Sequence, residues 1–195
     1  MKTITESQYK NAADKIGVEV PLIKAIEYVE SGGRNGFISP GKPCILFEGH
    51  IFWRQLKRVG IDPENVLKLS EMDDILYPKY DKTKYKGGLK EYDRLNKALS
   101  INKEAAYSSV SVGAFQILGS NYKACGFNSA EEYFKSSSES EYNQLLIFIN
   151  FIKSYPNMIE YLKDKNFDEF AKLYNGSKCF SMYSNRIRDA YNRFR

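Results

Sequence analysis

The chain has 195 residues, a formal net charge of +5 and a sequence pI near 8.9, and 43% of its residues are hydrophobic. This size and composition suit one well-packed core and exclude an intrinsically disordered chain. No stretch reaches the ~18 apolar residues of a membrane span, and the first residues lack the apolar segment of a signal peptide. The mildly basic charge favours a polyanionic partner such as cell wall, whereas no basic helix or aromatic–basic motif indicates nucleic-acid binding.

Helical periodicity dominates the beginning of the chain. A capping box at Thr5–Gln8 predicts a first helix, which Gly17 ends. Pro21 suits the first turn of a second helix with a continuous apolar face. The run Ser31–Gly33 ends this second helix directly after Glu30.

The rest of the chain predicts further helices around a small extended element. Residues 31–47 are expected to form a loop with an extended piece at Ile45–Phe47, and 60–90 an irregular segment. The remaining expected elements are helices over Ile51–Val59, near Glu91–Leu99 and over Glu139–Ser154, a glycine-bounded apolar run at Gly113–Gly119, and two or three helices within 157–195. We therefore expect a mainly α single domain over residues 1–195.

The cysteine and histidine content argues against a disulfide framework and against metal catalysis. Cys44, Cys125 and Cys179 are an odd number without a CxxC spacing, which predicts free thiols and folding in a reducing compartment. His50 is the only histidine, whereas a catalytic zinc site usually needs two or three imidazoles or a thiolate cluster. We expect neither a metal nor a cofactor.

Glu30 is the strongest candidate for catalysis. It is predicted in the last turn of a helix, where carbonyl dipoles disfavour negative charge, and Glu27 lies one turn earlier. Partial burial would act in the same direction. These three effects would raise the pKa of Glu30 and keep it protonated near neutral pH, as a glycosidase's general acid requires. The alternative is an ordinary surface glutamate before a glycine cap.

Three short motifs place Glu30 in a wider pattern. They are Glu30-Ser31, Gly113-Ala114-Phe115-Gln116 and Leu173-Tyr174-Asn175-Gly176. In order and separation they resemble the signatures of the goose-type lysozyme and soluble lytic transglycosylase superfamily. The resemblance implies that Glu30 is the catalytic acid, that Gln116 and Ser31 bind the sugar, and that Tyr174 and Asn175 support the acid and the substrate.

Longer stretches resemble a narrower group, the N-acetylmuramidase family of phage and prophage endolysins. They are Glu30–Gly33, Pro43–Trp53, Ser111–Gly119 and Tyr174–Gly176, with Phe47–His50 the most distinctive part. Where that family usually has tryptophan, this chain has Val112.

This resemblance implies a lysozyme-like fold and cleavage of the β-1,4 bond between N-acetylmuramic acid and N-acetylglucosamine in bacterial peptidoglycan. We expect a monomer that uses no membrane insertion and no separate wall-binding domain. Without a signal peptide it would be made in the bacterial cytoplasm and reach the wall through a holin or a secretion system.

The distinctive segment offers further candidates. Glu48 is a candidate second catalytic carboxylate that would position water or stabilise an oxocarbenium ion, or else an acid at a helix N-terminus. His50 is a candidate substrate-binding residue that would bond Glu48 or a sugar hydroxyl, with a structural role as the alternative. Trp53 fits core packing.

Three other activities stay open as alternatives. A lytic transglycosylase would leave 1,6-anhydro ends on the glycan. A Cys44–His50 amidase is disfavoured, because no predicted helix N-terminus activates the thiol. A non-catalytic wall-binding module would leave the pairing of Glu30 with Gln116 unexplained.

Overall fold

A computed structural model describes residues 3–69, 72–177 and 180–195, most of which are helical. In chain order the helices are α1 (Glu6–Ile16), α2 (Val20–Ser31), α3 (Gly49–Arg58), α4 (Pro63–Leu69), α5 (Lys90–Ile101), α6 (Lys103–Tyr107), α7 (Ala130–Ser137), α8 (Glu141–Lys153), α9 (Pro156–Lys163), α10 (Phe167–Asn175) and α11 (Phe180–Phe194). Two 3-10 turns are η1 (Lys82–Lys84) and η2 (Gly119–Asn121). The strands are β1 (Phe37–Ser39), β2 (Lys42–Pro43), β3 (Ile45–Phe47), β4 (Val110–Val112) and β5 (Ile117–Leu118). The expected mainly α fold is confirmed.

The first two helices begin and end as their capping residues predict. The Gln8 backbone N–H donates to the Thr5 hydroxyl at 3.3 Å, and the Thr5 N–H donates to the Gln8 side chain at 2.9 Å. Gly32 ends α2 in the left-handed conformation, at φ +64°, which glycine adopts without strain. The helix therefore stops just after Glu30 and leaves that carboxyl in its final turn.

A three-stranded antiparallel sheet lies at the centre of the molecule. Its order is β3-β4-β5, with Ile45 opposite Val112 and Val112 opposite Ile117. Val112 is buried in this sheet, at the place where the resemblance would put a tryptophan. Strands β1 and β2 pair as a separate hairpin, in a stretch that the sequence assigned to a loop.

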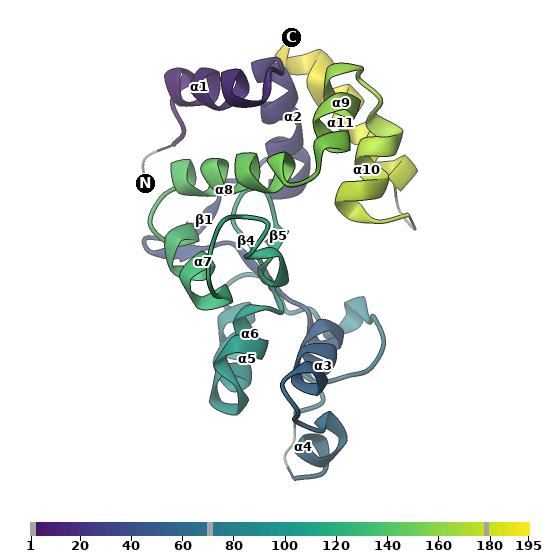
Figure 1. Cartoon of the computed structure of the whole chain (residues 1–195). Coiled ribbons are helices and arrows are strands. Elements are labelled where there is room, and N and C mark those ends of the chain that lie inside the picture. Colours follow the sequence, from purple (N-terminus) through teal and green to yellow (C-terminus); the bar gives the residue numbers. More distant parts are fainter. Residues whose placement is uncertain (1–2, 70–71, 178–179) are drawn as a thin grey trace.

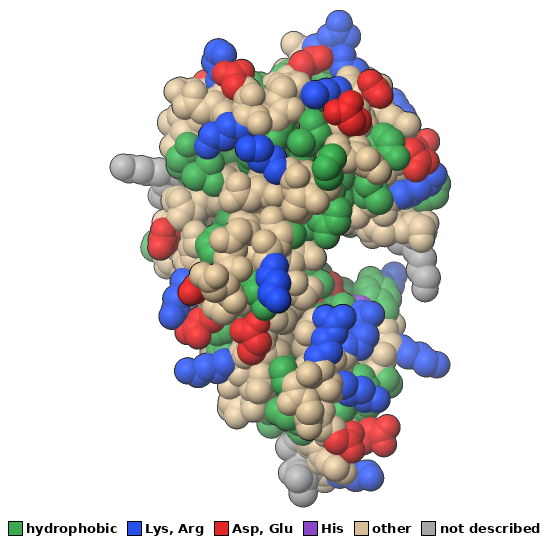
Figure 2. Space-filling model, viewed as in Figure 1, with side chains coloured by type: hydrophobic (Ala, Val, Ile, Leu, Met, Phe, Trp, Pro, Cys, Tyr) green, Lys and Arg blue, Asp and Glu red, His purple; other side chains and the backbone are tan. Residues whose placement is uncertain are grey.

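The helices form two groups on either side of this sheet (Figure 1). In the upper group, α11 packs against α2 and α10, and α1 packs against α2 and α8. The lower group holds α3, α4, α5 and α6, with β3 packed on α5. The space-filling view is hollowed at one side between the two groups (Figure 2). No helix in the described part of the chain is long and apolar enough to cross a membrane.

Aromatic packing ties the sheet to the upper group. Phe115, in the turn between β4 and β5, stacks on Phe148 of α8 with ring centroids 4.4 Å apart. Trp53 is buried in the core, as expected. Several short elements were missed by the sequence prediction, among them α4, η1, α6 and α7. Each has eight residues or fewer, so its apolar period repeats too few times to be recognised.

Candidate active site

Glu30 is held in a partly buried position by an amide from another helix. Asn175, the last residue of α10, donates from Nδ2 to Glu30 Oε1 at 2.8 Å. Burial raises the pKa of Glu30 to about 7, and the Asn175 hydrogen bond opposes the rise. The expected contribution of Glu27 is absent, because its carboxylate turns to a different face of α2 and accepts a hydrogen bond from Tyr9. Burial is thus the dominant cause of the raised pKa.

Tyr174 and Asn175 contact two different parts of the site. The Tyr174 hydroxyl donates to the Phe115 carbonyl at 2.7 Å, and its ring stacks on Phe170. Tyr174 therefore fixes the turn that carries Gln116, while Asn175 contacts the acid directly. Asn175 Oδ1 is buried and accepts no hydrogen bond from any described residue. A buried amide oxygen without a donor is uncommon and marks a place where a further partner fits.

Gln116 lies in a strained turn between β4 and β5. Its φ is +46°, a conformation that non-glycine residues seldom adopt outside functional sites. Its Nε2 donates to the Gly113 carbonyl at 2.8 Å and faces the Cys44 carbonyl at 3.4 Å. Gly113 has φ +76°, and an added Cβ would lie 2.5 Å from the Gln144 side chain. The turn therefore requires glycine there, and it holds the Gln116 amide in one orientation.

Glu48 lines the larger of two cavities beside Glu30 and lies directly before α3, in the lower helix group. It occupies the N-cap position, but its side chain makes no capping hydrogen bond. Instead the Tyr85 hydroxyl donates to Glu48 Oε2 at 2.5 Å. Burial raises the pKa of Glu48, and the Tyr85 hydrogen bond and the charge of Arg94 oppose this. The carboxylate is therefore turned away from its own helix.

A buried ion pair that the sequence analysis missed holds the segment before Glu48. Arg94 Nη1 and Glu91 Oε2 are 2.7 Å apart on α5, and both side chains are at most 1% exposed. Glu91 accepts from the Phe47 backbone N–H, and Arg94 donates to the Phe47 carbonyl. The same carboxylate accepts from the N–H groups of Lys86 and Gly87, next to Tyr85. In the sequence this pair looks like an ordinary surface pair at i, i+3, so only its burial reveals it.

Two cavities meet at Glu30. The larger, of about 440 Å³, is lined by residues from both helix groups, including Glu30, Glu48, Gln116, Tyr174 and Asn175. The smaller, of about 250 Å³, shares Glu30, Leu46 and Gln116 with it and adds Ser31, Arg34 and Cys44. Glu30 thus lies where the two cavities join into one groove.

His50 stands apart from this groove. It lines neither of the cavities that Glu30 lines. Its Nδ1 is 3.5 Å from Glu48 Oε2 and, although buried, makes no hydrogen bond to a described residue. The ring lies against Tyr77 and Tyr80, and burial, aided by Arg54, lowers its pKa. This environment suits a neutral ring that packs beside Glu48.

Neither of the two described thiols, Cys44 and Cys125, is activated. Burial raises the pKa of Cys44, although Arg34 opposes the rise, and burial raises that of Cys125 to about 12. A nucleophilic cysteine needs the opposite shift. Cys179 lies outside the described residues. Within the described ranges, no group of three or more His, Cys, Asp and Glu side chains could hold a metal ion.

Comparison with known proteins agrees with this geometry. A sequence model of the family described as N-acetylmuramidase matches residues 19–195. The crystal structure of Burkholderia AP3 phage endolysin is similar, with a TM-score of 0.84 and 33% sequence identity; the match covers 97% of this chain and 71% of that chain. Curated protein sequences give no significant match.

Proposed function

The chain belongs to the N-acetylmuramidase family, and from this premise we propose that Glu30 is its general acid, cleaving the β-1,4 bond between N-acetylmuramic acid and N-acetylglucosamine. As a member of this family the chain is a lysozyme-type glycosidase that cleaves peptidoglycan. One observation carries the proposal: a carboxyl whose pKa is raised to about 7 lies where the two cavities of the groove meet.

In this mechanism the glycosidic oxygen takes the proton of Glu30. Because Asn175 donates to Oε1, the proposed mechanism places the transferable proton on Oε2. Protonation of the leaving oxygen lets its bond to the muramic acid carbon break as positive charge develops on the sugar. A pKa of about 7 keeps an appreciable fraction of Glu30 protonated at neutral pH.

Glu48 is proposed as the second carboxylate. It lines the same cavity as Glu30 but comes from the other helix group. Burial raises the pKa of Glu48, while the Tyr85 hydrogen bond and the Arg94 charge oppose the rise; in the proposed mechanism Glu48 acts in its ionised form. An ionised carboxylate across the sugar accepts a proton from water as that water attacks, and the product is a reducing N-acetylmuramic acid end.

The polar lining supports substrate binding around these two groups. Gln116 lies beside Glu30 in both cavities, and its carboxamide oxygen accepts no hydrogen bond from a described residue. Ser31 lines the smaller cavity directly after the acid. We assign both to sugar hydroxyl or acetamido groups, while Tyr174 acts indirectly, by fixing the turn of Gln116.

Mass spectrometry of glycan fragments released from purified peptidoglycan tests the reaction. Hydrolysis gives reducing ends, whereas attack by the sugar's own 6-hydroxyl gives anhydro ends that are one water lighter. Glu48→Gln should slow the reaction, but less than Glu30→Gln. Mainly anhydro products would make the chain a lytic transglycosylase and would leave Glu48 with a structural or binding role.

A further inference from the structure

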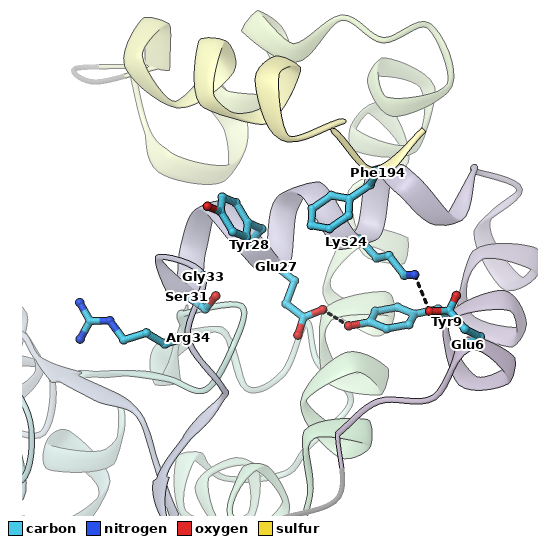
Figure 3. Close-up of a pocket in the computed structure, with 9 residues that line it drawn as sticks. All are labelled: Glu6, Tyr9, Lys24, Glu27, Tyr28, Ser31, Gly33, Arg34 and Phe194. Atoms are coloured by element: carbon cyan, nitrogen blue, oxygen red, sulfur yellow. Dashed lines mark hydrogen bonds and ion pairs between the residues drawn. The ribbon is translucent and has the colours of Figure 1, made fainter. Parts of the chain in front are cut away.

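A third cavity lies on the face of α2 next to that of Glu30. It has a volume of about 300 Å³, and Tyr9, Lys24, Glu27, Tyr28 and Phe194 line it (Figure 3). It shares Ser31 and Arg34 with the smaller cavity of the groove. The three cavities therefore lie next to one another in a row. The third cavity continues the groove, but the proposed cleavage step does not use it.

Charged groups in this cavity are arranged for a ligand with both signs of charge. Glu27 accepts from Tyr9 and pairs with no lysine or arginine among the described residues, because Lys24 is held by Glu6 at 2.6 Å. The Arg34 guanidinium likewise forms no ion pair within the described ranges; it extends away from Glu27 (Figure 3) and also lines the smaller cavity of the groove. An unpaired cation thus stands at the entrance and an unpaired carboxylate farther in.

Two aromatic rings complete the wall beside Glu27. Tyr28 is 38% exposed and Phe194 39% exposed, and their rings meet edge to face with centroids 5.8 Å apart. Arg193 stacks on Tyr28 and donates to its hydroxyl at 2.9 Å, which fixes that ring. Because Arg193 already covers the Tyr28 ring, Phe194 is the exposed ring beside the Glu27 carboxylate that suits an ammonium group on an alkyl stem.

We propose that this cavity binds the stem peptide of peptidoglycan, with a stem carboxylate on Arg34 and the free amino group of a diamino acid on Glu27. This rests on the proposed function, because the stem is attached to the N-acetylmuramic acid that would lie beside Glu30. The third cavity shares Ser31 and Arg34 with the cavity that Glu30 lines, and an extended peptide that passes them spans about 3.3 Å per residue. A diamino acid a few residues from the sugar therefore reaches Glu27.

Three forms of one substrate test the proposal with Glu27→Gln. They are peptidoglycan with free stem amines, the same material after acetylation of those amines, and glycan strands stripped of peptides by an amidase. For the wild type we expect acetylation to lower kcat/KM by about tenfold, the loss typical of one charge-assisted contact. Glu27→Gln should lose the same factor on the free-amine substrate and nothing further on the other two.

The control variant is Glu160→Gln, which changes an exposed glutamate on α9 outside all three cavities and should match the wild type on every substrate. Equal effects of Glu27→Gln on all three substrates, or no effect on any, would overturn the proposal. Cleavage of stripped strands by the wild type reports on the proposed function alone, so the two ideas fail separately.

Phe194→Ala gives a second test that leaves the packing around Glu27 intact. The half-exposed ring contributes one wall of the ammonium site, so its loss should narrow the difference between the free-amine and acetylated substrates. If Phe194→Ala still shows the full tenfold difference in kcat/KM between the free-amine and acetylated substrates, and Glu27→Gln shows no loss, the preference for the free amine arises elsewhere in the protein.

Discussion

Replacing Glu30 by Gln is expected to abolish activity and, at neutral pH, to stabilise the fold. Gln keeps the size of the side chain and an oxygen to accept from Asn175, but it cannot donate a carboxylic proton. Burial raises the pKa of Glu30 from 4.5 to about 7. Folding of the wild type therefore becomes less favourable as the pH rises from 4.5 to about 7, because the unfolded chain releases the Glu30 proton first.

The size of this gain follows from the pKa difference. The pKa of Glu30 is higher by about 2.5 in the folded chain than in the unfolded chain. This difference lowers the free energy of unfolding of the wild type by roughly 3 kcal/mol at pH 7.5, and by almost nothing at pH 4, where both states hold the proton. For a chain of this length, that gain shifts the midpoint of thermal unfolding by roughly 6–12 °C. Loss of general acid catalysis should lower turnover by ~10²–10⁴-fold.

Urea unfolding of both proteins at pH 4 and pH 7.5 measures the stability difference, and clearing of a cell-wall suspension measures activity. Glu160→Gln again serves as the control, since its exposed position predicts little change at either pH. A gain equal at both pH values would show that Glu30 does not titrate as its burial implies. Full lytic activity in a folded Glu30→Gln protein would refute its role as the acid.

Other substitutions test the neighbouring contacts. Tyr85→Phe removes the hydroxyl that donates to Glu48 and should slow peptidoglycan cleavage several-fold without unfolding the chain; unchanged turnover would count against a role for Glu48. Arg94→Met leaves Glu91 buried without its cation and should lower the free energy of unfolding in urea by about 3–5 kcal/mol. A loss under ~1 kcal/mol would contradict a stabilising role for the buried ion pair. Cys44→Ser, and separately addition of a chelator, should leave activity largely intact, and abolition by Cys44→Ser in a folded protein would instead favour thiol chemistry.

The sequence carried the information on Glu30 in its local signals. A helix with one apolar face, followed directly by a glycine cap, determines both the end of α2 and the position of the carboxyl in its last turn. Those signals involve neighbours three or four residues apart, so periodicity and capping rules detect them. The same rules located the extended piece at β3 and the long helix α8.

Contacts between distant segments were beyond those rules. The hydrogen bond from Asn175 to Glu30 joins residues 145 positions apart, and the direction in which Glu27 points depends on Tyr9 in another helix. The sequence therefore predicted a raised pKa for Glu30 but assigned part of it to the wrong neighbour. The buried ion pair of Glu91 and Arg94 was missed because only its burial in the folded protein distinguishes it from a solvated pair.

The two candidate carboxylates belong to different halves of the molecule. Glu30 lies in the last turn of α2 in the upper group, Glu48 directly precedes α3 in the lower group, and the short strands β3, β4 and β5 connect the halves. Under the proposed mechanism, the room left for a water molecule is set by the tilt between these halves. Substitutions in the connecting turn that keep Gly113 would then shift the balance between hydrolysis and ring closure without touching either carboxylate. Whether the product has a reducing or an anhydro end would then depend on how β3, β4 and β5 hold the two halves relative to each other.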